Sequence, residues 1–70
     1  MDINSIRLKE LRKEKGVTQS VVADEAGLSI KTIYRYEKDR VKRCELETIK
    51  KLADYYGVDS SCIVEARNDE

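Results

Sequence analysis

Three glycines divide this chain into segments whose apolar residues recur at helical spacing, and the chain contains no proline. Gly16, Gly27 and Gly57 each follow an amphipathic stretch, and glycine is the usual residue in the left-handed conformation that ends a helix. So few glycines and no proline argue against a loop-rich or many-turned β architecture. The pattern predicts an all-α fold for a single 70-residue domain.

The spacing predicts five short helices, which cover residues 3–15, 19–26, 29–38, 46–56 and a last segment capped by Asp59. We expect residues 3–66 to form the domain and residues 67–70 to be a frayed tail. Residues 38–44 show no periodicity and are predicted to form a loop. The positions expected to face the core are Ile3 or Ile6, Leu8, Leu11, Val21, Val22, Ala26, Ile33, Tyr36, Leu46, Ile49, Leu52, Ala53, Tyr56, Cys62, Ile63 and Ala66.

Composition excludes several classes of protein. Zero net charge and 17 Ile, Leu or Val residues favour a folded chain over a disordered one. No apolar run approaches the ~18 residues of a membrane span, and the first residues lack the apolar stretch of a signal peptide, so a cytoplasmic location without membrane contact is expected. Two cysteines, one of them (Cys62) expected to be half-buried, are predicted to be free thiols. Because histidine is absent, we expect no catalytic site, metal site or cofactor.

The connection between the second and third predicted helices contains only Gly27 and Leu28 before the capping Ser29. Such a tight, glycine-containing connection forces a steep crossing, which is the geometry of a helix-turn-helix unit. Charge is unevenly distributed along the chain: residues 28–43 carry a net +4, and residues 44–70 a net −4. A basic helix followed by a basic loop suits a polyanion such as DNA. The alternative is a merely solvated face, because the whole-chain pI is only 6.3.

From Arg7 to Val64 the chain resembles the phage-repressor and Cro-type helix-turn-helix family, whose fold is that of the lambda-repressor-like DNA-binding domains. The matching segments are IRLKELRKEKGVTQ, TQSVVADEAGLSIKTIYRYEKDR and LETIKKLADYYGVDSSCIV. The resemblance implies a compact five-helix bundle whose third helix lies in the major groove of DNA. It also implies residue roles. The base-contacting positions are Ile30, Lys31, Tyr34 and Arg35. The phosphate-contacting positions are Thr18, Gln19, Ser29, Lys38, Arg40, Lys42 and Arg43.

Arg12 and Glu37 match a family pair that joins the first helix to the end of the third. The pair either clamps the helices or positions an arginine for phosphate contact. We favour the clamp, because breaking a partly buried ion pair strands a charge. The chain departs from the family at Lys38-Asp39 and at Cys44-Glu45, where glutamate is a poor N-cap.

These observations predict a sequence-specific regulator of transcription that binds double-stranded DNA, a repressor rather than an activator by analogy. A bacterial or phage protein of this kind is associated with the nucleoid when it binds DNA. A homodimer is expected, and its face is placed near Tyr55 and Tyr56; no small-molecule effector is evident. The alternative is a helix-turn-helix module that binds a protein, such as an antitoxin or an accessory factor. Neutral net charge and the acidic carboxyl end favour that alternative.

Overall fold

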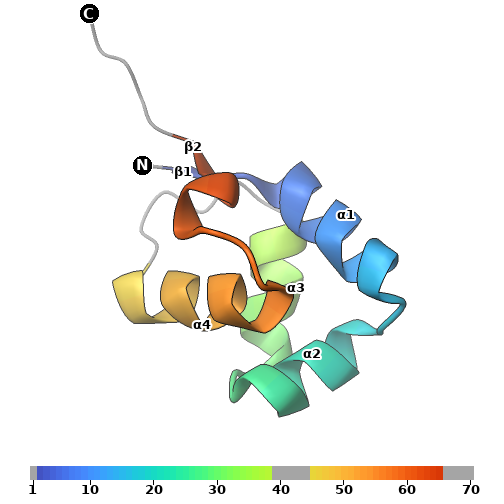
Figure 1. The fold of residues 1–70 in the computed structure, drawn as a ribbon. Helices are drawn as coiled ribbons and strands as arrows, with labels where there is room; N and C mark the ends of the chain where they lie inside the picture. The colour runs from blue at the N-terminus through green and yellow to red at the C-terminus, as the bar shows by residue number, and fades with distance from the viewer. Residues whose placement is uncertain (1, 39–44, 66–70) are drawn as a thin grey trace, which may run out of the picture.

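Four α-helices make up most of the structure, a computed structural model that describes residues 2–38 and 45–65, without the side chains of Asp2 and Glu65. In chain order the elements are β1 (Asp2–Ile3), α1 (Ser5–Lys15), α2 (Gln19–Ala26), α3 (Ile30–Lys38), α4 (Leu46–Tyr56), the 3-10 turn η1 (Ser60–Cys62) and β2 (Val64–Glu65). Figure 1 shows α3 between α1 and α4, with α2 crossing one end of the molecule. The predicted bounds of the second, third and fourth helices are confirmed to within one residue.

Side chains and glycines define the helix ends as the sequence predicts. Thr18 Oγ1 accepts a hydrogen bond from the N–H of Val21 at 3.3 Å, and Ser29 Oγ accepts one from Thr32 at 3.2 Å. Gly27, at φ +74°, takes the left-handed conformation that a side chain would strain, and its N–H donates to the carbonyl of Ala23. These caps satisfy backbone groups that have no partner inside a helix.

The predicted fifth helix is wrong. After η1, β2 pairs with β1 in antiparallel register, with Ile3 opposite Val64. The N–H of Asn4 also donates to the carbonyl of Ile63 at 2.9 Å. These backbone groups bond to the amino-terminal segment, so no helix can continue through them. For the same reason α1 begins at Ser5 rather than at residue 3, capped by Asn4 Oδ1. Ala66 and the predicted tail at residues 67–70 lie outside the described residues.

The core lies where α1, α3, α4 and the strand pair converge, next to α2. Its buried apolar residues are Ile3, Leu8, Leu11, Val22, Ala23, Ile33, Tyr36, Ile49, Leu52, Ala53 and Ile63. Three residues predicted to face inward are exposed, namely Val21, Leu46 and Cys62, and of the alternatives Ile3 and Ile6 it is Ile3 that is buried. Ile6 is 74 % exposed because Ile3, from β1, fills the position that either isoleucine could have taken. Val21 points away because only Val22 and Ala23 of the short α2 are buried in the core.

Leu46 and Cys62 are exposed because they lie at the ends of their elements. Leu46 is the first residue of α4 and is 68 % exposed, and Cys62 ends a single 3-10 turn rather than lying on the inner face of a helix. Glu45 makes no side-chain capping bond, but its N–H donates to Tyr36 Oη at 3.4 Å.

None of the helices in residues 2–38 and 45–65 has both the length and the apolar character that crossing a bilayer requires.

A tyrosine pair joins α4 to α1 and α2. Tyr55 and Tyr56 pack against the core, with their rings edge to face and their centroids 5.1 Å apart. Tyr55 Oη donates to Glu25 Oε1 of α2 at 2.6 Å, and Lys15 Nζ of α1 lies 4.9 Å from the Tyr55 ring centroid. Both rings are therefore engaged in contacts within the domain.

We expect Glu25→Gln to lower the pKa of Tyr55. The hydrogen bond to the Glu25 carboxylate, assisted by partial burial, raises this pKa from 10.0 to about 12. Burial, followed by the charge of Glu37, raises the pKa of Tyr56 to about 12 as well. In an NMR pH titration of the tyrosine ring carbons, the variant should bring Tyr55 back toward 10 and leave Tyr56 near 12.

The raised value of Tyr55 also makes stability depend on pH. Because the folded state keeps the proton longer than the unfolded state, this contribution is complete below pH 10 and is lost as the pH rises toward 12. An unchanged Tyr55 midpoint in Glu25→Gln would show that the hydrogen bond is not the cause of the shift.

Candidate nucleic-acid interface

α2 and α3 form a helix-turn-helix unit. Gly27 in the left-handed conformation turns the chain, the N–H of Leu28 donates to the carbonyl of Ala23 at 2.8 Å, and Ser29 then caps α3. Figure 1 shows α2 and α3 crossing steeply, as the short connection predicts. α2 buries Val22 and Ala23 in the core, and α3 buries Ile33 and Tyr36. Both helices are thus held by the core, and the rest of α3 remains at the surface.

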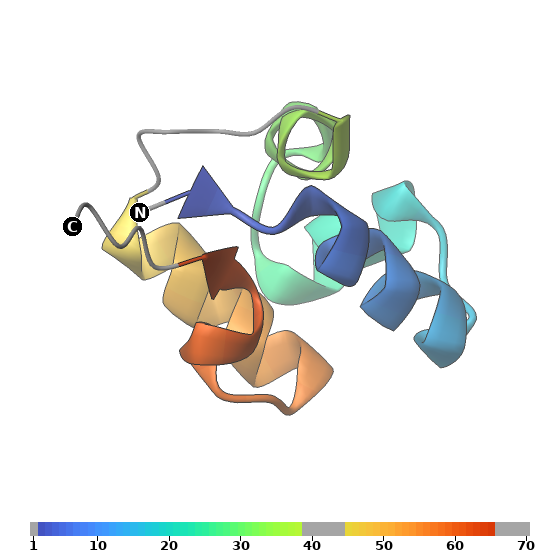
Figure 2. The same cartoon turned by 90° about the horizontal axis from the view of Figure 1, so that it is seen from above.

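One face of α3 is turned outward. Figure 2 shows α3 nearly end-on at the edge of the molecule, with the other described helices all on one side of it. The four predicted base-contacting residues are exposed: Ile30, Lys31, Tyr34 and Arg35. Ile30 is 52 % exposed and Tyr34 49 %, a high value for large apolar side chains that a monomer's own core could have buried. This face therefore exposes two cations and two large apolar side chains.

The predicted phosphate-contacting residues surround this face in part. Thr18, Gln19 and Ser29 lie at the amino ends of α2 and α3, where unpaired backbone N–H groups favour an anion. All three are engaged within the protein, because Thr18 and Ser29 use their hydroxyl oxygens as helix caps and the Gln19 amide donates to Glu37. Lys38 ends α3, and its Nζ lies 5.2 Å from the centroid of the Tyr34 ring. Three predicted contacts lie outside the described residues: Arg40, Lys42 and Arg43.

A buried ion pair connects α1 to the carboxyl end of α3. Arg12 Nε lies 2.9 Å from Glu37 Oε2 and 3.0 Å from Oε1, and the Glu37 side chain is only 3 % exposed. Arg12 Nη1 also donates to the carbonyl of Val17 at 3.0 Å. Gln19 Nε2 of α2 donates to Glu37 Oε1 at 3.2 Å. One carboxylate thus joins the first three helices, and both of its oxygens are occupied.

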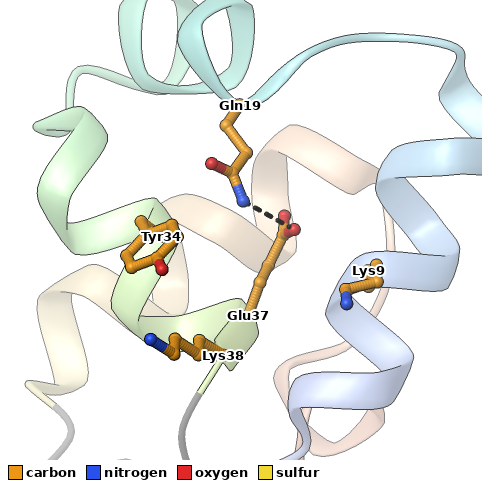
Figure 3. Close-up of a pocket in the computed structure, with 5 residues that line it drawn as sticks. All are labelled: Lys9, Gln19, Tyr34, Glu37 and Lys38. Carbon is orange, nitrogen blue, oxygen red and sulfur yellow. Dashed lines mark hydrogen bonds between the residues drawn. The ribbon is translucent and has the colours of Figure 1, made fainter.

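The hydrogen bond to Glu37 also orients Gln19, whose second Nε2 hydrogen remains available to an outside acceptor. Figure 3 shows the hollow beside it, lined by Lys9, Gln19, Tyr34, Glu37 and Lys38 and about 340 Å³ in volume. Lys9 belongs to α1 and was not among the predicted site residues. Its charge cancels in the sum over residues 1–27, which is zero, and that balance concealed Lys9 in the sequence.

In residues 2–38 and 45–65, no group of three or more Cys, Asp or Glu side chains is placed to hold a metal ion.

Comparison with known proteins agrees with this geometry. Residues 5–62 match the family described as the helix-turn-helix domain. The chain is 39 % identical over 54 residues to the cryptic phage CTXphi transcriptional repressor RstR of Vibrio cholerae. The match covers 77 % of this chain and 48 % of the repressor, so the chain spans about half the length of that relative.

Proposed function

The chain belongs to the helix-turn-helix domain family, and from that premise we propose that it is a sequence-specific, double-stranded-DNA-binding regulator of transcription, acting as a repressor. The observation that carries the proposal is the outward face of α3, where Lys31 and Arg35 stand exposed beside Ile30 and Tyr34. An α-helix fits the major groove, in which each base pair presents a distinct pattern of donors and acceptors. The similarity to a named phage repressor favours repression over activation.

The side chains on this face suit different parts of a base pair. Arg35 can donate two parallel hydrogen bonds to the O6 and N7 atoms of guanine, and Lys31 can reach the same edge with less selectivity. Ile30 can contact the methyl group of thymine. Gln19 and Lys38 contact phosphates, together with Thr18 and Ser29 through backbone N–H groups, and so fix the position of the helix without specifying sequence.

The proposed unit is residues 3–66, the span closed by the pairing of Ile3 with Val64. We propose that it acts as a homodimer, because helix-turn-helix proteins commonly bind two half-sites about 34 Å apart, one turn of the double helix. A repressor of bacterial or phage DNA acts in the cytoplasm, on the nucleoid. No enzymatic step, cofactor or small-molecule effector enters this function.

Selection of bound duplexes from a random pool tests the function at roughly 100 to 150 mM salt, where non-specific phosphate binding is already weakened. We expect an enriched inverted repeat whose half-sites contain a guanine opposite Arg35. A folded protein that enriches no motif would contradict the proposal. It would favour a module that binds a protein partner, to which the neutral net charge of the chain is also suited.

A further inference from the structure

The charges of α1 do not cancel where they lie. Its five cations and two acids are distributed unevenly over the helix surface. Arg7 Nη1 lies 3.3 Å from Glu10 Oε1 and 3.9 Å from Glu14 Oε2, so one arginine is paired with both acids of α1. Arg12 is paired with Glu37. Within the described residues, no hydrogen bond or ion pair involves the ammonium group of Lys9, which therefore adds a full positive charge to its side of α1.

Lys9 lies beside α3. It lines the hollow shown in Figure 3 together with Gln19, Tyr34 and Lys38, and Glu37 forms part of the wall. Glu37 is the acid of this hollow, and its charge is balanced by Arg12 through both carboxylate oxygens. Among the described residues that line the hollow, the ammonium group of Lys9 consequently leaves a positive charge without a counter-charge, and Lys38 is a second cation beside it. Tyr34 adds a hydroxyl donor and Gln19 an amide hydrogen.

The hollow lies where a phosphate backbone would border the major groove if α3 occupied that groove. An α-helix with its side chains is about 10–12 Å across, and the major groove is about 12 Å wide, so a helix in the groove meets a phosphate backbone along each flank. Tyr34 and Lys38 border both the outward face of α3 and the hollow. A backbone that follows this flank of α3 would therefore pass over Lys9.

We propose that this hollow holds one backbone phosphate of the duplex that α3 contacts, bound by Lys9, Lys38, the Gln19 amide and the Tyr34 hydroxyl. The inference rests on the proposed DNA-binding function. It adds a phosphate contact from α1 and moves Tyr34 from the base-contacting group to the phosphate-contacting group. Lys38 Nζ over the Tyr34 ring is consistent with this assignment, because the two side chains then face the same anion.

Lys9→Gln tests whether the hollow binds a phosphate. The affinity of the variant for the duplex that the selection identifies is measured by fluorescence anisotropy over a series of salt concentrations. Losing one phosphate contact should reduce the slope of log affinity against log salt by about 1. Affinity at low salt should fall several-fold, by the same factor on the selected duplex and on its single-base variants. Lys9→Arg, which keeps the charge, should retain most of the wild-type slope.

Lys51→Gln is the matched control. Lys51 also carries one positive charge, and it lines a different hollow, between α2 and α4, together with Glu25, Asp54 and Tyr55. This variant should keep the wild-type slope. If Lys9→Gln and the wild type gave the same slope of log affinity against log salt on a duplex that the wild type binds selectively, the proposed phosphate site would be wrong. The proposed function would remain intact. A wild-type protein that binds no duplex would overturn both.

Tyr34→Phe tests the reassignment of the tyrosine. The variant keeps the ring and loses only the hydroxyl donor, so we expect a uniform loss of affinity on every duplex. A changed preference at one base pair would instead show that Tyr34 contacts a base.

Discussion

Replacing Glu37 by alanine is expected to lower the melting temperature of the domain by roughly 12 to 24 °C. Removing one partner of a buried ion pair costs about 3 kcal/mol, and in a domain of this size each kcal/mol corresponds to about 4–8 °C. Here the lost carboxylate leaves the Arg12 guanidinium, itself only 17 % exposed, with the carbonyl of Val17 as its remaining hydrogen-bond partner among the described residues. It also releases Gln19. Thermal unfolding followed by circular dichroism measures the effect.

Glu14→Ala is the matched control, because Glu14 is 67 % exposed and lies 3.9 Å from Arg7. An exposed pair of this kind contributes about 0–1 kcal/mol, so the melting temperature should change little. A double-mutant cycle with Arg12→Ala would separate the pair energy from the loss of either side chain. If Glu37→Ala melted at the wild-type temperature, the pair would not be the clamp between α1 and α3. A role in positioning Arg12 for phosphate contact would then become the better interpretation.

The helices were predictable because their signals are local. Glycines end three of the helices, hydroxyl side chains cap two, and apolar spacing marks the inner faces. The end of the domain was not predictable in the same way, because the apolar residues after Asp59, which are Cys62, Ile63 and Ala66, keep a helical spacing in the sequence. Pairing of β2 with β1 depends on contact between the two ends of the described chain, which no local pattern encodes. The choice between Ile3 and Ile6 depended on the same contact.

The outer face of α3 was predictable from the sequence because its period separates Ile33 and Tyr36 from the exposed residues. The hollow beside it was not. Summed over residues 1–27 the charge is zero, and the sum says nothing of which cations are neutralised. Only the side-chain geometry shows both acids of α1 beside Arg7, and Lys9 facing α3. Because both acids of α1 pair with Arg7, the charge of Lys9 is left without a counter-charge on its own helix, which composition alone does not show.

Arg35→Ala is expected to weaken binding to the selected duplex by about 5- to 150-fold, the loss of roughly 1–3 kcal/mol that a bidentate contact to guanine contributes. Arg35 is exposed on the outward face of α3, away from the buried Ile33 and Tyr36. Its removal should therefore leave the fold and the melting temperature unchanged. The preference for guanine depends on the two parallel N–H donors of the guanidinium, which lysine lacks. Arg35→Lys should therefore keep the charge and much of the non-specific affinity but lose the preference for guanine.

The informative measurement is a comparison between duplexes rather than one affinity. We expect Arg35→Ala to bind the selected duplex and a duplex in which the guanine opposite Arg35 is replaced equally well. Lys9→Gln should instead weaken binding to both duplexes and preserve the ratio of the two affinities. The two variants remove the same formal charge, so electrostatics alone would give them the same pattern. An Arg35→Ala variant that keeps the wild-type ratio at every position would place Arg35 on a phosphate. Sequence discrimination would then depend on Lys31 and Ile30, nearer the amino end of α3.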